Sequence, residues 1–191
     1  AEGGGCAPGV LVATRDGAGA WSPRLIPGQD APLAAQVVNW VDVLATTAAD
    51  GTPLVCVAWG QYSASGVFAS CSPDGGATFE PQGVIAFHAA PAGEDEPDWD
   101  TTDRGYHPEL VYSPAADRLV AVWLLREAAP ADASENPAYL VWSCRDRTQP
   151  TWWPRIADPL IEPALRLVAT TRRSAARDPR VAEGPTGLAW V

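Results

Sequence analysis

The densest group of ionisable side chains lies between residues 94 and 107. Clustered carboxylates and carbonyls are the ligands that Ca²⁺ prefers, although no twelve-residue calcium-loop pattern is present. A carboxylate acting as acid or base beside stacking aromatic rings would instead suit recognition or hydrolysis of a sugar. A solvated polar loop is the third interpretation, and all three stay open. The residues concerned are Glu94, Asp95, Glu96, Asp98, Trp99, Asp100, Asp103, Arg104, Tyr106 and His107.

A second charged segment is basic and carries Arg166, Arg172, Arg173 and Arg177. Guanidinium groups grip carboxylates through paired hydrogen bonds, which fits an acidic sugar as well as the acidic segment 94–103. Glu127 adds a further carboxylate just after an apolar run. The candidate catalytic residues are Asp103, Tyr106 and Glu127. The candidate ligand-binding residues are Asp98, Trp99, Asp100, Asp103, Arg104, Tyr106, His107, Arg172 and Arg173.

Metal ligands other than carboxylates are few. His88 and His107 are the only histidines, and two such loop residues are more often structural or exposed than metal-bound. No C-x-x-C spacing indicates zinc or redox chemistry. We therefore expect no metal site and no cofactor, with Ca²⁺ at the acidic loop 94–103 as the alternative.

Composition limits the classes of function. The 191 residues carry a net charge of −10 without any lysine, which argues against nucleic acid and anionic membrane surfaces as partners. No apolar run approaches the roughly 18 to 20 residues of a membrane span. The 17 glycines, 19 prolines and 9 tryptophans accompany many short Val, Leu and Ala runs. This mixture favours an all-β protein of short strands over a helical one.

Four cysteines, Cys6, Cys56, Cys71 and Cys144, allow three pairings. If 54–60 and 66–72 form a hairpin, Cys56 and Cys71 lie opposite each other, as a cross-strand disulfide or as buried free thiols. The chain begins without Met, which indicates removal of an N-terminal segment by a signal peptidase or during production. We expect an exported protein, secreted to the extracellular space or the periplasm.

The strongest local pattern is the octamer Ser72 to Phe79, which reads Ser-x-Asp-x-Gly-x-Thr-aromatic. Asp and Ser side chains accept hydrogen bonds from the N–H groups of such a turn, and Gly supplies a positive φ. Phe79 would fold back as an apolar plug under the hairpin. Incomplete copies occur at 14–21 and 144–152, each after a strand-like run. The pattern residues are Ser72, Asp74, Gly76, Thr78 and Phe79, with Asp16, Trp21, Asp146 and Trp152 in the copies.

This octamer resembles the Asp-box, or BNR repeat, of sialidase-like β-propellers, with all five defining positions present. The resemblance implies an architecture, because the box lies away from the active face in that family. Active sialidases use three arginines, an Asp acid/base and a Tyr activated by Glu, and carry an Arg-Ile-Pro motif before the first box. The segment 22–27 matches this motif poorly and follows a box instead of preceding it. We therefore assign no catalytic residue of the family to this chain. The family also includes many non-enzymatic scaffolds.

A second repeat, of two paired strands, lies between the boxes and after the last of them, and carries Trp59, Trp123 and Trp190 about 65 residues apart. This length suits a four-stranded propeller blade with long loops. We expect one propeller domain over residues 1–191, with an outer half-blade at 1–27, blades at 39–88 and 107–160, and an inner half-blade at 178–191. The tryptophans at strand ends and in the boxes are interpreted as packing between blades.

Three blades are too few to close a ring, and an open stack would expose sheet edges and apolar faces. The economical solution is a two-fold homodimer of six blades, in which two half-blades combine. The rival is that the chain is half of a longer or heteromeric propeller. The segments 61–65, 89–106, 126–137 and 163–178 would then open on the axial face, where propellers usually bind ligands.

Two functional hypotheses follow. The first is a secreted, carbohydrate-binding or scaffolding propeller whose partners are a second copy of itself and a glycan at the axial face. The second is a sialidase-like glycoside hydrolase that uses Asp103 or Asp100, Glu127 and Tyr106. Fold alone does not decide between them.

Overall fold

The computed structural model describes residues 10–15, 17–27, 38–61, 66–87, 104–126, 138–152, 166–170, 181–184 and 187–190. These residues form β-strands and turns and contain no helix, and hence none able to cross a bilayer. The all-β prediction is therefore confirmed. The strands are β1 (Leu11–Arg15), β2 (Trp21–Leu25), β3 (Val38–Thr47), β4 (Pro53–Gln61), β5 (Gly66–Ser72), β6 (Gly83–Phe87), β7 (Arg104–Ser113), β8 (Arg118–Arg126), β9 (Ala138–Asp146), β10 (Arg166–Thr170), β11 (Val181–Gly184) and β12 (Gly187–Trp190).

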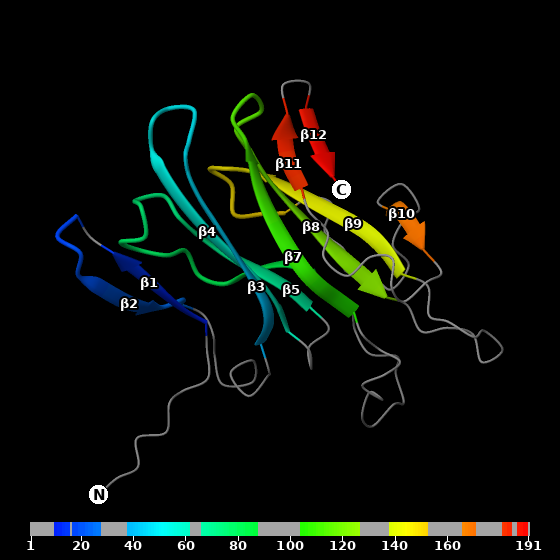
Figure 1. The fold of residues 1–191 in the computed structure, drawn as a ribbon, viewed down its shortest axis with the longest axis horizontal. Coiled ribbons are helices and arrows are strands. Elements are labelled where there is room, and N and C mark those ends of the chain that lie inside the picture. The colour runs from blue at the N-terminus through cyan, green and yellow to red at the C-terminus, as the bar shows by residue number, and fades with distance from the viewer. Residues whose placement is uncertain are drawn as a thin grey trace, which may run out of the picture.

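The described strands form four antiparallel sheets in which neighbours in sequence are neighbours in space (Figure 1). Two are four-stranded: the first sheet, in the order β3-β4-β5-β6, and the second sheet, in the order β7-β8-β9-β10. Two are two-stranded: the N-terminal hairpin β1-β2 and the C-terminal hairpin β11-β12. Each four-stranded sheet is a simple meander, as expected when short turns connect antiparallel strands.

One predicted loop is wrong. Residues 163–178 were expected to be a loop, but residues 166–170 form β10 and pair with β9 at the edge of the second sheet. Arg166 belongs to this strand, so it is not part of a basic loop. The segment Leu-Val-Ala is apolar and favours a β-strand, but the arginines around it suggested a polar loop.

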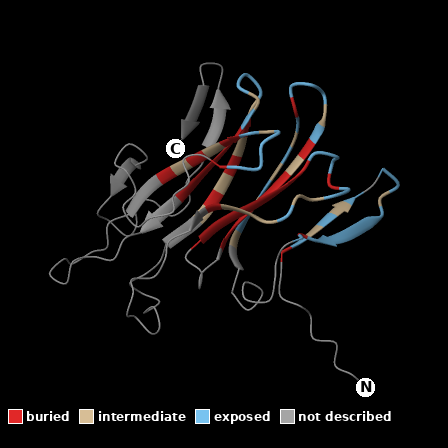
Figure 2. Ribbon diagram, turned by 180° about the vertical axis from the view of Figure 1, so that it is seen from behind, coloured by how far each residue is buried: buried red, intermediate tan, exposed pale blue. Residues whose placement is uncertain are grey.

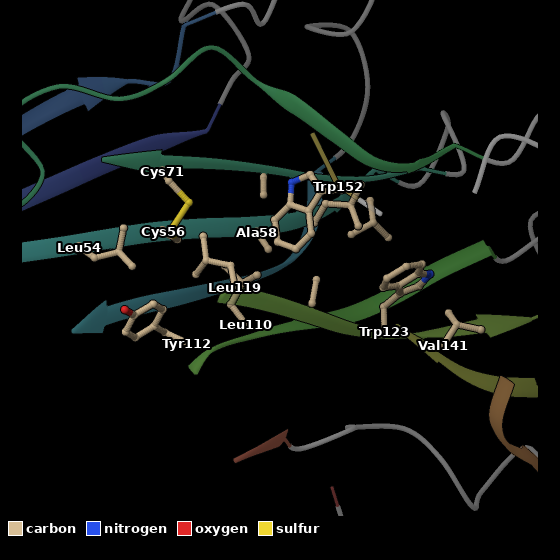
Figure 3. Packing of buried hydrophobic residues seen from close by; sticks show 14 of the residues in the cluster. Leu54, Cys56, Ala58, Cys71, Leu110, Tyr112, Leu119, Trp123, Val141 and Trp152 are labelled. Atoms are coloured by element: carbon tan, nitrogen blue, oxygen red, sulfur yellow. A yellow bond between two sulfur atoms is a disulfide. The ribbon is translucent and has the colours of Figure 1, made fainter. Parts of the chain in front are cut away.

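The sheets stack face to face, and their apolar faces make the core (Figures 2 and 3). One face of the first sheet packs on the second sheet through a cluster that includes Cys56, Ala58, Leu110, Trp123 and Trp152. In the series of units, β3 contacts β7 and β7 contacts β11. The first strand of each unit is therefore next to the first strand of the following unit.

The other face of the first sheet carries Val57, Trp59 and Phe68, which pack against Val10 and Ile26 of the N-terminal hairpin. Since both faces of the first sheet are covered at these strands, β5 is buried along its whole length. This explains why β4 and β5 are apolar without strict alternation.

The hairpin β4-β5 places Cys56 directly opposite Cys71, and the two form a disulfide with a Cα–Cα distance of 4.1 Å. Both residues are buried in the core between the two four-stranded sheets. Of the two interpretations left open by the sequence, the cross-strand disulfide is confirmed. Cys144 is a free, half-buried cysteine on β9.

Removing this disulfide should destabilise the fold strongly. The cysteines are 15 residues apart, and closing a loop of that size contributes about 3 kcal/mol to the free energy of unfolding. The double variant Cys56→Ala/Cys71→Ala should therefore lose about 3 kcal/mol in urea unfolding at pH 7 and fixed protein concentration. Cys144→Ala is the control and should lose clearly less. Equal losses in the two variants would contradict the assignment.

Candidate functional site

The two ends of the stacked sheets differ. We call "turn end" the end at which β3 turns into β4, β7 into β8, and the Ser72–Phe79 octamer follows β5. The opposite "loop end" is where residues 62–65, 88–103 and 127–137 leave the strands. The turn end shows how the scaffold is fixed, and the loop end carries the candidate site.

At the turn end, the octamer closes on itself through the side chain of Asp74. Thr78 donates from its N–H group to Asp74 Oδ1 at 2.8 Å and from Oγ1 to Asp74 Oδ2 at 2.6 Å. Ser72 Oγ donates to Asp74 Oδ1 at 2.7 Å and accepts from the N–H of Gly76 at 2.7 Å. Four of the five pattern positions are thus joined in one network. The turn chemistry expected from the sequence is present in this octamer.

The glycines of the octamer have a steric role. Gly75 and Gly76 have φ values of 72° and 95°, a region that side chains with a Cβ rarely adopt. A Cβ on Gly76 would also collide with Cγ2 of Thr14 in the N-terminal hairpin. The octamer of the first sheet therefore rests directly on the preceding hairpin.

The closing aromatic residues fill the space between units. Phe79 is half-buried against the cluster between the N-terminal hairpin and the first sheet. Trp152 is 2% exposed in the cluster between the first and second sheets. Trp59 and Trp123 are fully buried, which agrees with the interpretation of these tryptophans as packing residues. Trp21 is the exception, because it is 65% exposed.

The incomplete copies use their polar residues differently. In the copy at 144–152, Asp146 accepts a hydrogen bond of 2.7 Å from Arg118 Nε of the neighbouring strand, and Arg145 Nη2 lies 2.9 Å from Glu80 Oε2. In the copy at 14–21, residues 14 and 21 belong to β1 and β2, and Asp16 lies outside the described residues. Among the described residues, the network centred on an Asp carboxylate is found in the complete octamer, whereas the copy at 144–152 uses its Asp in an ion pair.

An ion-pair network at the turn end links the two four-stranded sheets. Arg147 donates from Nε to Asp117 Oδ1 at 2.8 Å and from Nη2 to Asp50 Oδ2 at 2.7 Å. Tyr112 donates to Asp117 Oδ1 at 2.6 Å and accepts from the N–H of Ala49 at 3.0 Å. Turns of the first and second sheets are thereby held in register. This cluster is a structural link, since each group in it has a partner within the protein.

The carboxyl groups of the turn end have lowered pKa values. Hydrogen bonds from the side chain of Thr78, and then from Ser72, hold the pKa of Asp74 well below its ordinary value of 3.8. A hydrogen bond from the side chain of Thr52 lowers the pKa of Asp50, and the Arg147 guanidinium lowers the pKa of Asp117. All three groups are therefore charged in the folded protein at neutral pH.

Stability should consequently fall in acid. A carboxyl group whose pKa is lower in the folded state stabilises the fold above its ordinary pKa, and this contribution disappears as the pH falls through the folded-state pKa. Urea unfolding from pH 7 downwards should show a loss that begins below about pH 5. Asp74→Asn should be less stable at pH 7 and should show a smaller decrease in acid. Parallel pH curves for the two proteins would contradict this account.

At the loop end, the first strands of the two four-stranded sheets carry equivalent bulges. The register of β3 with β4 shifts around Trp40, and that of β7 with β8 shifts around His107. Trp40 has a φ of 51° and His107 a φ of 48°. Bulky residues rarely adopt positive φ, and such strain together with bulges occurs preferentially at functional sites.

The two bulges bring their side chains into contact. The rings of Trp40 and His107 have centroids 4.9 Å apart at an interplanar angle of 45°, and both residues are partly exposed. Nearby, Asp42 Oδ2 of β3 accepts a hydrogen bond of 2.7 Å from the N–H of Leu110 of β7. This bond ties the two strands together just below the ring pair. An accessible aromatic platform thus lies across two sheets at the loop end.

The structure places the predicted site residues unequally. His107 is in the ring pair, and the backbones of Arg104 and Tyr106 lie in β7 on the loop side of it. β10 ends and β7 begins at the loop end. The other predicted residues, and also His88, lie outside the described residues: Asp98, Trp99, Asp100, Asp103, Glu127, Arg172 and Arg173.

The acidic loop 94–103, where Ca²⁺ was the alternative expectation, also lies outside the described ranges. Among the side chains that the structure does describe, no three His, Cys, Asp or Glu residues are grouped so that they could hold a metal ion. Trp40 was not among the predicted site residues. Trp40 and His107 lie 19 and 16 residues before Trp59 and Trp123 of the next strand, so no common spacing in the sequence marked them.

Comparison of the chain with protein-family models, with curated proteins and with solved structures found no significant match. The function therefore has to be argued from the arrangement of strands and side chains.

Proposed function

We propose that this chain is half of a six-bladed β-propeller of the Asp-box type, which closes with a second copy and binds a ligand at its loop end. The observation that carries the proposal is the order of the sheets. Two complete four-stranded units are flanked by one two-stranded hairpin at each end. The first strands β3, β7 and β11 contact each other in series, as the inner strands around a propeller axis do.

The two hairpins are complementary halves of a blade. The N-terminal hairpin covers the first sheet at β4, β5 and β6 but leaves Val41 and Val43 of β3 exposed, at 53% and 57%. The C-terminal hairpin contacts the second sheet at its first strand, β7. The C-terminal hairpin of a second copy would therefore cover the part of the first sheet that the N-terminal hairpin leaves open.

The free sheet edges point to the same partner. In the four-stranded sheets, the second strand pairs with the third, as β4 does with β5 and β8 with β9. β12 is the second strand of its unit and β1 the third of its own, so β12 of one copy can pair with β1 of the other. Such pairing removes two exposed edges and joins the two hairpins into one four-stranded sheet.

The proposed ligand site is the ring pair of Trp40 and His107, together with the predicted binding residues Arg104 and Tyr106 of β7. In a propeller these residues face the axial opening. Electron-rich ring faces attract the polarised C–H groups of a sugar, and the basic and acidic segments would supply polar contacts. A secreted, glycan-binding scaffold is therefore the function we propose. The disulfide is compatible with an extracellular location.

Ring closure can be tested by light scattering on the purified chain. We expect a mass twice the 20.1 kDa of one chain. The double variant Val41→Glu/Val43→Glu should be monomeric, because it introduces charges on a face that the second copy covers. Ala115→Glu, in the exposed β7–β8 turn, is the control and should remain dimeric. A wild-type mass of one chain would overturn the proposed closure.

Ligand binding can be tested with a panel of immobilised glycans that includes sialosides, followed by calorimetry. Trp40→Ala and His107→Ala should each weaken binding at least about tenfold, the loss typical of an aromatic anchor. Thr148→Ala at the turn end should bind like the wild type. Unchanged affinity in both aromatic variants would refute this site. If the protein hydrolyses labelled sialosides and Asp103→Ala and Tyr106→Phe abolish this activity, the binding-only function is wrong and the hydrolase hypothesis takes its place.

A further inference from the structure

Trp21 and Arg15 of the N-terminal hairpin repeat a pair that is buried elsewhere in the chain. The Arg145 guanidinium lies 5.6 Å from the ring centroid of Trp152, and the Arg15 guanidinium lies 6.0 Å from that of Trp21. Each Arg precedes an Asp near the end of a third strand, and each Trp closes the following turn. The same local arrangement therefore occurs in the unit that opens the chain and in the second sheet.

The surroundings of the two pairs differ completely. Trp152 is 2% exposed and belongs to the cluster with Ala58, Cys56 and Cys71 of the first sheet (Figure 3). Arg145 is also buried and reaches Glu80 of the first sheet. The second sheet thus uses its Arg–Trp pair to pack on the unit before it.

Trp21, by contrast, is 65% exposed. Leu11 and Leu25, which pair with each other on the same face of the hairpin, are 63% and 51% exposed. Figure 2 shows this hairpin as mostly exposed at one flank of the stack. An apolar face with this pattern has the composition of an internal contact rather than of a solvated surface.

The face that matches it lies at the opposite flank, on the second sheet. Val120 and Val122 of β8 are buried there, whereas Trp142 and Cys144 of β9, which belong to the same small cluster, are half-buried. Cys144 pairs with Val120 as Cys71 pairs with Cys56. The face is therefore equivalent to the part of the first sheet on which Trp152 packs. A hollow of about 380 Å³ opens beside Cys144, between Arg118, Asp146, Gln149 and Thr151.

We propose that Trp21 of one copy packs on this face of the second sheet of another copy, beside Cys144, and anchors the interface of the ring. This inference rests on the proposed closure by a second copy and specifies which residues meet. It repeats, between two chains, the contact that Trp152 makes within one chain. Asp146, which is 54% exposed, lies next to the hollow and offers a negative charge to the incoming Arg15.

The native thiol of Cys144 provides a direct test. In a Cys6→Ser background, Trp21→Cys should form a disulfide between chains when oxidised with glutathione at a protein concentration high enough to offset the lost Trp ring, seen as a reducible dimer on a gel. Peptide mapping should show position 21 joined to Cys144. The link cannot form within one chain, because the N-terminal hairpin and this face of the second sheet lie at opposite flanks (Figure 1). Adding Cys144→Ser should abolish it.

Leu25→Cys in the same background is the matched control. It lies on the same face and is similarly exposed, but it is four residues further along β2, a distance of about 13 Å in a strand. It should not link to Cys144. A link from position 25 in place of position 21 would overturn the proposed contact.

A second measurement separates this inference from the proposed closure. Trp21→Ala should keep the circular dichroism of the wild type, since the side chain is exposed in a single copy, but should raise the dimer dissociation constant about 30-fold or more. A monomeric wild type would refute the closure itself. A dimeric wild type without the 21–144 link, or with unchanged affinity in Trp21→Ala, would refute only the docking of Trp21.

Discussion

The requirement that both faces of a stacked sheet be covered governs this molecule. Burying apolar surface yields about 25 cal/mol per Å², and β5 is buried on both faces because a unit lies on either side of it. Buried tryptophans fill the contacts that this stacking creates, and the disulfide joins β4 and β5 within the first sheet. Where the stack ends, the covering ends too, and large apolar side chains of β1, β2 and β3 become exposed.

The contacts that fix the turns lie at one end of the stack, and the proposed ligand site lies at the other. The turn end is held by the Asp74 network, by Arg147 between two turns, and by Glu80 with Arg145. The carboxylates of these ion pairs are solvent-accessible, and ion pairs screened by water contribute little individually, so these contacts set the register of turns while burial supplies most of the free energy. The loop end has the strained bulges and the long connections, and can vary without loss of the core.

The sequence predicted those features that depend on local chemistry. The octamer is determined by side chains that bond to their own turn, and the register of Cys56 with Cys71 follows from a short hairpin. β10 was missed because its five residues stand beside arginines that suggested a loop. The contact of Trp40 with His107 was missed because it joins two strands about 65 residues apart. Periodicity carries no information on such a contact, which depends on how the sheets stack.

The position of the exposed residues also bears on the kind of assembly. Pairing β12 of one copy with β1 of the next is a head-to-tail contact, which gives a closed ring or an endless filament according to the rotation per chain. If each chain supplies three of the six units of a ring, it spans half of the circle. A second copy, rotated by half a turn, then places each N-terminal hairpin beside the C-terminal hairpin of the other copy. Both exposed flanks then disappear at once. A smaller or larger rotation would leave the exposed apolar side chains of the N-terminal hairpin and of β3 uncovered at the ends of every assembly, which favours the proposed closure by two copies.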